Sequence, residues 1–398
     1  METVITPDQL STREVIRDPY PAYRQLRDRS PFYYVELPAG SVPGIEEQSR
    51  WALMKYADVY GALRDHETFS SANNPLVGKA FPPLVLILDD PPRHTRFRRL
   101  VNRAFTLKRI EALTPWITSV ASELLDGARL GEIDIVQRYT IPLPVKVIAR
   151  LLGIPGEDYE TFKGWSDAFL SLVSMDNTER MRSIQEMVGY FGKIAAARRA
   201  HGAEDLITAL VEAEVEGEKL EEWEILGFCM LLLIAGNETT TNLIGNILNL
   251  LAARPELWEQ LRTDRALVET VIDETLRYES PVQRLARTTT RDVEVSGVRI
   301  PKGDLVTVYF GAANRDPTEF PNPGEFRLDR DLRNHVAFGV GIHYCLGVPL
   351  ARAETKATLN AFLDRFSAIK PGAAPAVRQT MTPVVFGFQQ LPLVLKRH

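Results

Sequence analysis

Cys345 lies in a glycine-rich stretch, FGVGIHYCLG at residues 338–347. Glycine permits backbone angles and close approaches that a side chain forbids, so this spacing predicts a tight loop. A helix-like segment follows from Val348, and backbone N–H groups at a helix start favour thiolate over thiol. A thiolate ligates metals, and a single protein thiolate is one of the known axial ligands of haem iron. The alternative interpretation is a small buried cysteine in a glycine turn.

A second unusual stretch, AGNETTT at residues 235–241, lies inside an apolar segment. Apolar residues recur at helical spacing from Leu226 to Leu251, which predicts a long, mostly buried helix over 220–252. Polar side chains are costly in such surroundings unless they are hydrogen-bonded. One interpretation is a groove where dioxygen lies beside an acid–alcohol pair, Glu238 and Thr239. The other is polar helix packing, in which hydroxyls bond carbonyls one turn back and bend the helix.

Charged residues at helical spacing mark two further helices. His94 and Arg98 are four apart on a strongly basic segment that begins at residue 93, so they share one helix face. A His and an Arg on one face can bind the two propionates of a haem by charge-assisted hydrogen bonds; the alternative is a solvated basic face. Glu274 and Arg277 are three apart and can pair, as many surface residues do.

The cysteine stretch resembles the signature of the cytochrome P450 family, Phe-Gly-x-Gly-x-His/Arg-x-Cys-x-Gly, at every fixed position. Gly236, Glu238 and Thr239 match a second family pattern, Ala/Gly-Gly-x-Asp/Glu-Thr, with Glu in place of the commoner Asp. The resemblance extends along nearly the whole chain. It implies a mainly helical fold with a minor β region, in which haem b lies between the long central helix and the cysteine loop. It also implies a single haem-thiolate monooxygenase domain over residues 1–398.

The resemblance assigns roles to individual residues. Cys345 would ligate the iron. The residues at propionate-binding positions would be His94, Arg98, Arg287 and His343. The other haem neighbours would be Ala235, Gly236, Thr239, Phe338, Gly339 and Gly347. Glu274, Arg277 and Arg330 would form a buried structural triad that does no chemistry.

The same resemblance implies an apolar substrate pocket. Its candidate lining is Leu84, Val85, Leu86, Leu231, Ile234, Ala235, Val282, Val385 and Phe386. Core packing is the alternative for each of them. Such a lining suits steroids, terpenoids, fatty acids or polyketide-like compounds and does not choose among them. The segment 161–197 reads as two helices, which form either a substrate lid, as in the family, or an ordinary helical hairpin.

The implied reaction is hydroxylation of an apolar small molecule with O2 and two electrons. Cys345 would donate electron density that favours O–O cleavage, and Thr239 with Glu238 would deliver protons. The chain has no flavin or nicotinamide fingerprint, so a ferredoxin with its reductase, or a flavodoxin, would supply the electrons. The alternatives are a peroxide-driven peroxygenase, a nitric oxide reductase and a haem-binding sensor without turnover. The acid–alcohol pair favours oxygen activation over all three.

Composition limits the other classes of function. The 398 residues carry a formal net charge of −5, which argues against general nucleic-acid affinity. Two cysteines exclude a disulfide framework and indicate a reducing cytosol. No signal peptide is evident, and no run approaches the ~18 apolar residues of a spanning helix. We therefore expect a cytoplasmic monomer without a membrane anchor.

Other elements follow from local pattern. We expect a first helix over 17–29, short strands near 51–54, 293–300 and 306–309, and a β-hairpin over 381–393. The apolar run at 84–88 lies in a stretch rich in Pro, Gly and Asn. It is either a buried edge strand or part of a loop that lines the substrate.

Overall fold

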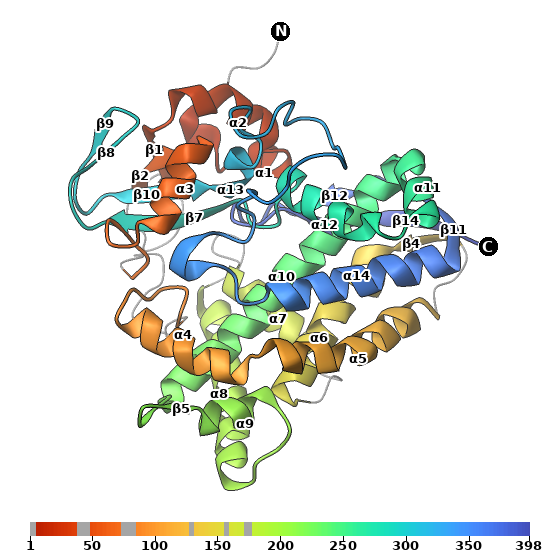
Figure 1. Cartoon of the computed structure of the whole chain (residues 1–398), viewed down its shortest axis with the longest axis horizontal. Helices are drawn as coiled ribbons and strands as arrows, with labels where there is room; N and C mark the ends of the chain where they lie inside the picture. Colours follow the sequence, from red (N-terminus) through yellow and green to blue (C-terminus); the bar gives the residue numbers. More distant parts are fainter. Residues whose placement is uncertain (1–4, 38–47, 73–84, 127–130, 155–158, 171–176) are drawn as a thin grey trace. The chain divides into compact units, whose positions relative to one another are not determined.

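The chain divides into two compact units of helices and small sheets (Figure 1). The computed structural model describes residues 5–37, 48–72, 85–126, 131–154, 159–170 and 177–398. Unit 1 takes its residues from 1–74, 263–345 and 377–389, and unit 2 from 75–262, 346–376 and 390–398.

A five-stranded sheet with strand order β1-β2-β10-β7-β3 is the base of unit 1. The strands are β1 (Phe32–Leu37), β2 (Gln48–Leu53), β3 (Phe69–Ser70), β7 (Arg284–Thr289) and β10 (Leu305–Tyr309). The central strand β10 runs parallel to β2 and antiparallel to β7. Val306 and Val308 alternate along β10, so both point to one face, where they are fully buried with Leu53. These β-branched residues explain the strand predicted there.

Short helices and hairpins complete unit 1. The helical segments are η1 (Pro7–Gln9), α1 (Arg13–Arg17), α2 (Tyr20–Leu26), η2 (Arg27–Arg29), α3 (Tyr56–Arg64), α12 (Leu267–Tyr278), α13 (Phe310–Ala313) and η5 (Gly341–His343). The two-stranded sheets pair β8 (Val293–Val295) with β9 (Val298–Ile300), and β12 (Val377–Arg378) with β13 (Phe388–Gln390). The predicted first helix is therefore α1, α2 and η2, with breaks after Arg17 and Leu26.

Unit 2 is mainly helical. Its helices are α4 (Arg93–Ala104), α5 (Leu107–Asp126), η3 (Val136–Thr140), α6 (Pro142–Leu152), α7 (Tyr159–Leu170), α8 (Asn177–Ala200), α9 (Leu206–Glu212), α10 (Glu222–Ala253), α11 (Pro255–Thr263) and α14 (Val348–Arg365). Its sheets have the strand orders β11-β14-β4 and β5-β6. The strands are β4 (Gly131–Asp134), β5 (Glu214–Val215), β6 (Glu218–Lys219), β11 (Phe366–Pro371) and β14 (Pro392–Arg397).

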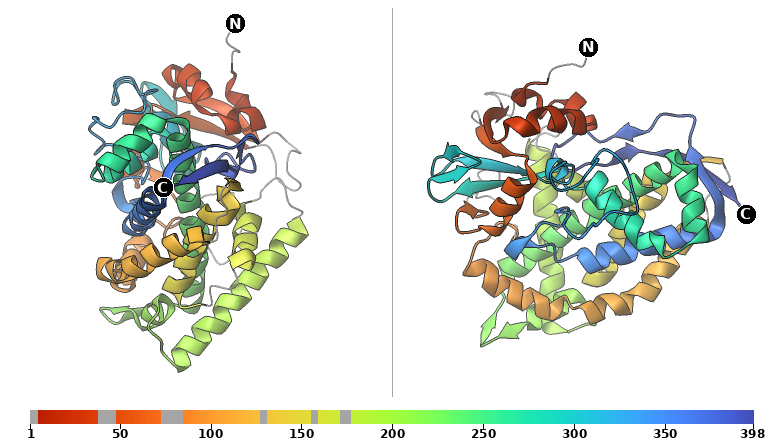
Figure 2. Two further views of the ribbon diagram at one scale, coloured as in Figure 1. Left: turned by 90° about the vertical axis from the view of Figure 1, so that its right-hand side faces the viewer. Right: turned by 45° about the horizontal axis from the view of Figure 1, so that its top comes forward.

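The long helix α10 organises unit 2. Glu221 and Glu224 form a reciprocal capping box that begins the helix and satisfies N–H groups without an intrahelical partner. The apolar residues that follow are almost all buried, against α6, α7, α8 and α14. In Figure 1, α14 runs beside α5, and Figure 2 shows α8 as one unbroken helix. The predicted helix over 220–252 is thus confirmed to within two residues.

One of three further predicted segments is present, one is a turn, and one differs from the prediction. The pair predicted over 161–197 is present as α7 and α8. Residues 85–88 form a turn rather than an edge strand, with Leu86 at φ +74°; residue 84 lies outside the described residues. The hairpin predicted over 381–393 is wrong in its bounds, because the strands that pair are β12, which lies before residue 381, and β13. Proline, which lacks an N–H donor, stands at 383 and 392.

Among the helices that the structure describes, none is long and apolar enough to cross a membrane.

Candidate active site

The cysteine loop of unit 1 holds its backbone in a tight, hydrogen-bonded turn. The Cys345 N–H donates to the Phe338 carbonyl at 3.0 Å, and the Gly339 N–H donates to Val336 O at 2.8 Å. Gly339 and Gly341 have φ of +70° and +73°, a region that L side chains rarely adopt. The loop leaves Cys345 exposed. The predicted tight loop that presents one sulfur is therefore present.

Gly341 also meets a steric requirement. A Cβ built at this position would lie 2.9 Å from the carbonyl oxygen of Leu63, near the end of α3. Backbone cannot move aside as the end of a side chain can, so only glycine fits here. The cysteine loop is thereby seated against α3, and Val340 packs on the same core cluster as Leu63.

The chain's other cysteine is chemically different. Cys229 is buried within α10, and burial raises the pKa of its thiol far above the ordinary value. Cys229 therefore behaves as a small apolar residue, which is the alternative weighed for Cys345.

His343 and Arg287, the two unit 1 residues predicted to bind propionates, lie on η5 and β7. His343 ends η5, with its Nε2 3.1 Å from the Ser71 hydroxyl. Arg287 lies on β7, is mostly buried, and donates to the Ala286 carbonyl at 2.8 Å. The sequence carried no signal for Ser71. It follows β3, which pairs with β7.

One face of α10 is open in an otherwise buried helix. Between residues 224 and 252, the residues that are not fully buried are Leu232, Ala235, Gly236, Thr239 and Asn249. The first four have the spacing i, i+3, i+4 and i+7, so they share one face. Gly236 packs closely on α6: a Cβ at this position would lie 2.7 Å from Ile148 Cδ1, and the end of that side chain would have to shift. The predicted residues Leu231 and Ile234 are buried instead, and Leu232 was not predicted.

The three threonines of this stretch have different environments. Thr239 is on the open face, and its hydroxyl donates to the Ala235 carbonyl at 2.6 Å, the back-bond expected from such residues. Thr240 is buried. Thr241 is buried too, and donates to the Thr140 carbonyl of η3 at 2.8 Å. Only Thr239 therefore combines a hydroxyl with access to the open face.

Glu238 is held by a residue that the sequence did not indicate. Lys163 Nζ on α7 lies 3.0 Å from Glu238 Oε1. Their side chains are 21% and 12% exposed, so the pair is partly shielded from water. The ion pair links the predicted lid segment to the acid of the acid–alcohol pair. No local pattern could have revealed it, because 75 residues separate the two partners.

The basic helix α4 separates its charges by face. His94 is buried and Arg98 half-buried, four residues apart as the propionate prediction requires. Other arginines of α4 turn toward acidic neighbours of unit 2. Arg96 contacts Glu224 at 2.8 Å and Glu218 at 3.3 Å, while Arg99 contacts Glu216 at 3.1 Å.

The structure brings together the three residues of the proposed structural triad in unit 1. Arg277 and Glu274, both fully buried, form two parallel hydrogen bonds of 2.7 Å. Arg330 Nε lies 3.3 Å from the same carboxylate. Arg277 also donates to the carbonyls of Asn314 and Pro323 at 3.1 and 3.0 Å, so the triad ties α12 to the segment before the cysteine loop.

The candidate substrate residues have different surroundings. Val282 and Val385 form an isolated β-bridge, so the structure brings these two together. Phe386 is buried and makes an edge contact with Tyr20, in a pocket rich in arginine. Val85 and Leu86 are buried in unit 2. Leu84 lies outside the described residues.

An exposed cysteine in a glycine-rich loop, ahead of a helix in a mainly helical fold, is the arrangement expected of a haem-thiolate protein. The chain matches the family described as "Cytochrome P450" over residues 133–397. It belongs to the cytochrome P450 family and is a P450 monooxygenase, with haem b as cofactor.

Relatives agree over almost the whole chain. "Cytochrome P450 109" of Bacillus spizizenii is 39% identical, over 94% of this chain and 91% of that protein. "Vitamin D(3) 25-hydroxylase" of Pseudonocardia autotrophica is 36% identical, over 95% of this chain and 94% of that protein. The solved structure of CYP109E1 from Bacillus megaterium in complex with testosterone has a TM-score of 0.86 at 36% identity. It covers 96% of this chain and 99% of that chain. The predicted fold class is thereby confirmed.

The residues present fit haem b. The Cys345 thiol is exposed and its backbone is clamped on the Phe338 carbonyl. The open face of α10 carries small side chains, Ala235 and Gly236, which leave room for a flat ring system, beside the Thr239 hydroxyl.

Proposed function

We propose that this P450 hydroxylates a steroid-like apolar small molecule, with O2 and two electrons from an external donor protein. The observation that carries the proposal is the exposed Cys345 thiol in a loop closed by backbone hydrogen bonds. In the proposal Cys345 ligates the iron. His94, Arg98, Arg287 and His343 bind the haem propionates by charge-assisted hydrogen bonds.

When bound, haem supplies the oxygen-activating chemistry, and the chain controls protons and access. The Thr239 hydroxyl donates to the Ala235 carbonyl, so its oxygen remains available to accept a hydrogen bond. To pass a proton on, the hydroxyl releases that carbonyl, gives up its own proton and takes another from solvent. Glu238 is the next acidic group on the chain, and the Lys163 ammonium holds its carboxylate in place. We assign Thr239 to deliver protons, Glu238 to resupply them, and Lys163 to position Glu238.

The steroid class is supported by two relatives. CYP109E1 is solved with testosterone, and the Pseudonocardia relative is named as a vitamin D(3) hydroxylase. The candidate lining of this chain is apolar, which suits a large apolar skeleton. A spectral titration of the purified enzyme tests the assignment. Steroids should convert the haem from low to high spin at lower concentration than fatty acids or monoterpenes of equal hydrophobicity. A stronger response to fatty acids would contradict the steroid assignment.

The change Cys345→Ser tests the thiolate assignment directly. Oxygen replaces sulfur at nearly the same size, so the fold should persist while the ligand changes. We expect loss of the red-shifted Soret band in the reduced carbon monoxide difference spectrum, together with loss of hydroxylation. Cys229→Ser is the matched control and should retain both. A variant at Cys345 that kept spectrum and turnover would refute the proposal.

We further propose that an acidic ferredoxin or flavodoxin docks where α4 ends and α5 begins. Arg96 and Arg99 are already paired with glutamates, whereas Arg103 and Lys108 are exposed. His94 and Arg98 share α4 with Arg103, so a donor on this helix approaches the proposed propionate contacts. A cluster of positive surface charges attracts a negatively charged partner and raises its association rate.

Charge reversal tests this docking. The double variant Arg103→Glu/Lys108→Glu should lower the second-order rate of reduction by a surrogate ferredoxin about tenfold at low salt. The difference should shrink as salt screens the charges. Reduction by dithionite should not change. Arg99→Gln is the control and should have a small effect. Equal rates for the double variant and the wild type would place the donor elsewhere.

A further inference from the structure

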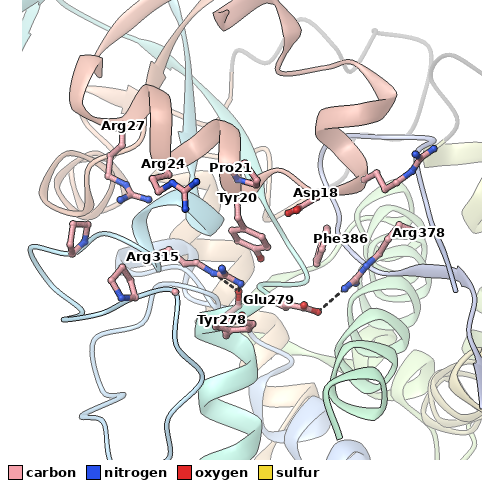
Figure 3. Close-up of a pocket in the computed structure, with 14 residues that line it drawn as sticks. Asp18, Tyr20, Pro21, Arg24, Arg27, Tyr278, Glu279, Arg315, Arg378 and Phe386 are labelled. Carbon is pink, nitrogen blue, oxygen red and sulfur yellow. Dashed lines mark hydrogen bonds and ion pairs between the residues drawn. The ribbon is translucent and has the colours of Figure 1, made fainter. Parts of the chain in front are cut away.

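A pocket in unit 1 is lined by residues that, with one exception, are not candidates for haem or substrate contact (Figure 3). Its volume is about 700 Å³, which is in the range of small-molecule sites. The walls come from α2 and η2, the end of α12, the segment 315–324, and the β12–β13 hairpin. Of the lining residues, only Phe386 was also a candidate for substrate contact.

The lining is strongly basic. Five arginines (Arg17, Arg24, Arg27, Arg315 and Arg378) face only two acidic residues, Asp18 and Glu279. This is a formal excess of three positive charges. Glu279 is already paired with Arg378 at 3.0 Å, as the dashed line in Figure 3 shows. The remaining arginines therefore dominate the charge that a ligand would meet.

Arg315 is fixed in orientation. Its guanidinium lies between two aromatic rings, 3.6 Å from the Tyr20 centroid and 3.7 Å from that of Tyr278. Its Nε and Nη2 donate to the Tyr278 carbonyl at 2.8 and 2.6 Å. A cation stacked between rings and held by two hydrogen bonds is preorganised, so a ligand need not pay to order it.

Arg27 gives the second, independent observation. Its side chain is 7% exposed, yet its Nε has no hydrogen-bond partner, and it forms no ion pair with any residue that the structure describes. Burial lowers its pKa, and Asp316 and Asp28 oppose that effect. Asp28 is exposed, and the Asp316 carboxylate accepts hydrogen bonds from Tyr56 and Thr318 instead. A buried guanidinium that has no ion-pair partner among the described residues, and whose Nε is unbonded, is costly unless a ligand completes it.

Helix geometry places three lining residues on one face. Tyr20, Arg24 and Arg27 follow the spacing i, i+4 and i+7 through α2 and η2, so they point in the same direction. In Figure 3 they are drawn along the helix that borders the pocket, with Arg315 below them. Guanidinium groups thus reach the cavity from two separate segments of the chain.

We propose that this pocket binds an organic phosphate monoester. The phosphate dianion would be held by Arg24, Arg27 and Arg315, since guanidinium groups form charge-assisted, often bidentate bonds with phosphate oxygens. The cavity is much larger than a phosphate alone. Its aromatic walls, Tyr278 and Phe386, suit an apolar or aromatic body on the ester.

Calorimetric titration of the haem-loaded enzyme in phosphate-free buffer tests the site with three probes: phenyl phosphate, inorganic phosphate and benzoate. Phenyl phosphate should bind one site and bind tightest, followed by inorganic phosphate and then benzoate. It should leave the Soret band unchanged. Arg24→Gln and Arg27→Met should each weaken phenyl phosphate at least about tenfold, as loss of a charged hydrogen bond implies. The matched control Arg29→Met changes an exposed arginine of η2 outside the pocket and should bind normally.

The Arg27→Met variant carries a signature that a merely structural arginine would not show. Without ligand its melting temperature should equal or exceed that of the wild type, because an unpaired buried charge has been removed. Should this variant fail to fold, Arg24→Gln decides the question, since Arg24 is exposed. Binding that Arg24→Gln leaves unchanged, tighter binding of benzoate, or a phosphate-induced spin shift would each overturn the proposal.

Discussion

Thr239 differs from Thr240 and Thr241 only in the face of α10 that it occupies. All three can hydrogen-bond to a carbonyl, but Thr241 is committed to η3 and Thr240 is buried. Of these three hydroxyls, only that of Thr239 lies on the open face, so the proposed proton delivery is assigned to it alone. The neighbouring acid, Glu238, forms an ion pair with Lys163 of α7.

The change Thr239→Ala should uncouple electron use from product formation. A positioned proton donor is worth about 10²–10⁴ in rate, so product formed per NADH should fall about tenfold or more, with peroxide taking its place. Substrate affinity, read from the spin shift, should stay the same. Thr239→Ser keeps the hydroxyl and should retain most of the coupling. Wild-type coupling in the alanine variant would remove Thr239 from the proton path.

Helix α14, which follows the cysteine loop in the chain, contains a buried glutamate, Glu354. Glu354 is buried, and its Oε2 has no partner among the described residues. Burial raises the pKa of Glu354 well above its ordinary value of 4.5. The protonated form is therefore favoured in the fold. Above pH 4.5 the unfolded chain releases this proton first, so this residue's contribution to stability is lost as pH rises.

Replacing the Glu354 carboxyl with an apolar side chain should remove this loss of stability at higher pH. Glu354→Met should stabilise the protein by about 1–3 kcal/mol at neutral pH, the cost of an unpartnered buried polar group. The gain should shrink toward pH 4.5. Melting temperatures measured from pH 5 to 8 check this. Lys356→Met adds the same side chain at an exposed position of α14 and should have little effect. A gain independent of pH would contradict the linkage.

At the scale of the whole molecule, a few buried charges hold distant segments of unit 1 together. In unit 1 the triad joins α12 to residues 314–330. Its carboxylate also accepts the Arg327 N–H at 2.9 Å. One residue, Glu274, thus satisfies donors from three others.

Glu274→Gln should destabilise the protein by about 3–5 kcal/mol, because it leaves two arginines buried without their countercharge. Urea unfolding measures the loss. The folded fraction should keep its red-shifted carbon monoxide spectrum, which separates a structural role from a chemical one. Arg327→Gln removes only an exposed side chain and should stay within about 0.5 kcal/mol. Equal stability of the two variants would show that the triad does not hold these segments of unit 1 together.

Local pattern determined much of this protein by itself. The glycines around Cys345 predicted the loop because positive φ excludes most side chains, and the apolar period predicted α10 because one helix face repeats every 3.6 residues. The Glu274–Arg277 pair followed from the same spacing. These features depend on neighbours in the sequence, which a reader of the chain can count.

Only the tertiary structure decided the remainder. The Lys163–Glu238 pair, the Ser71–His343 contact and the basic pocket all join residues far apart in the chain. The open face of α10 runs through Leu232 rather than Leu231, since packing against other helices decides which residues of an apolar helix remain open. Contacts between distant segments are set by packing and burial, and these leave no periodic trace in the sequence.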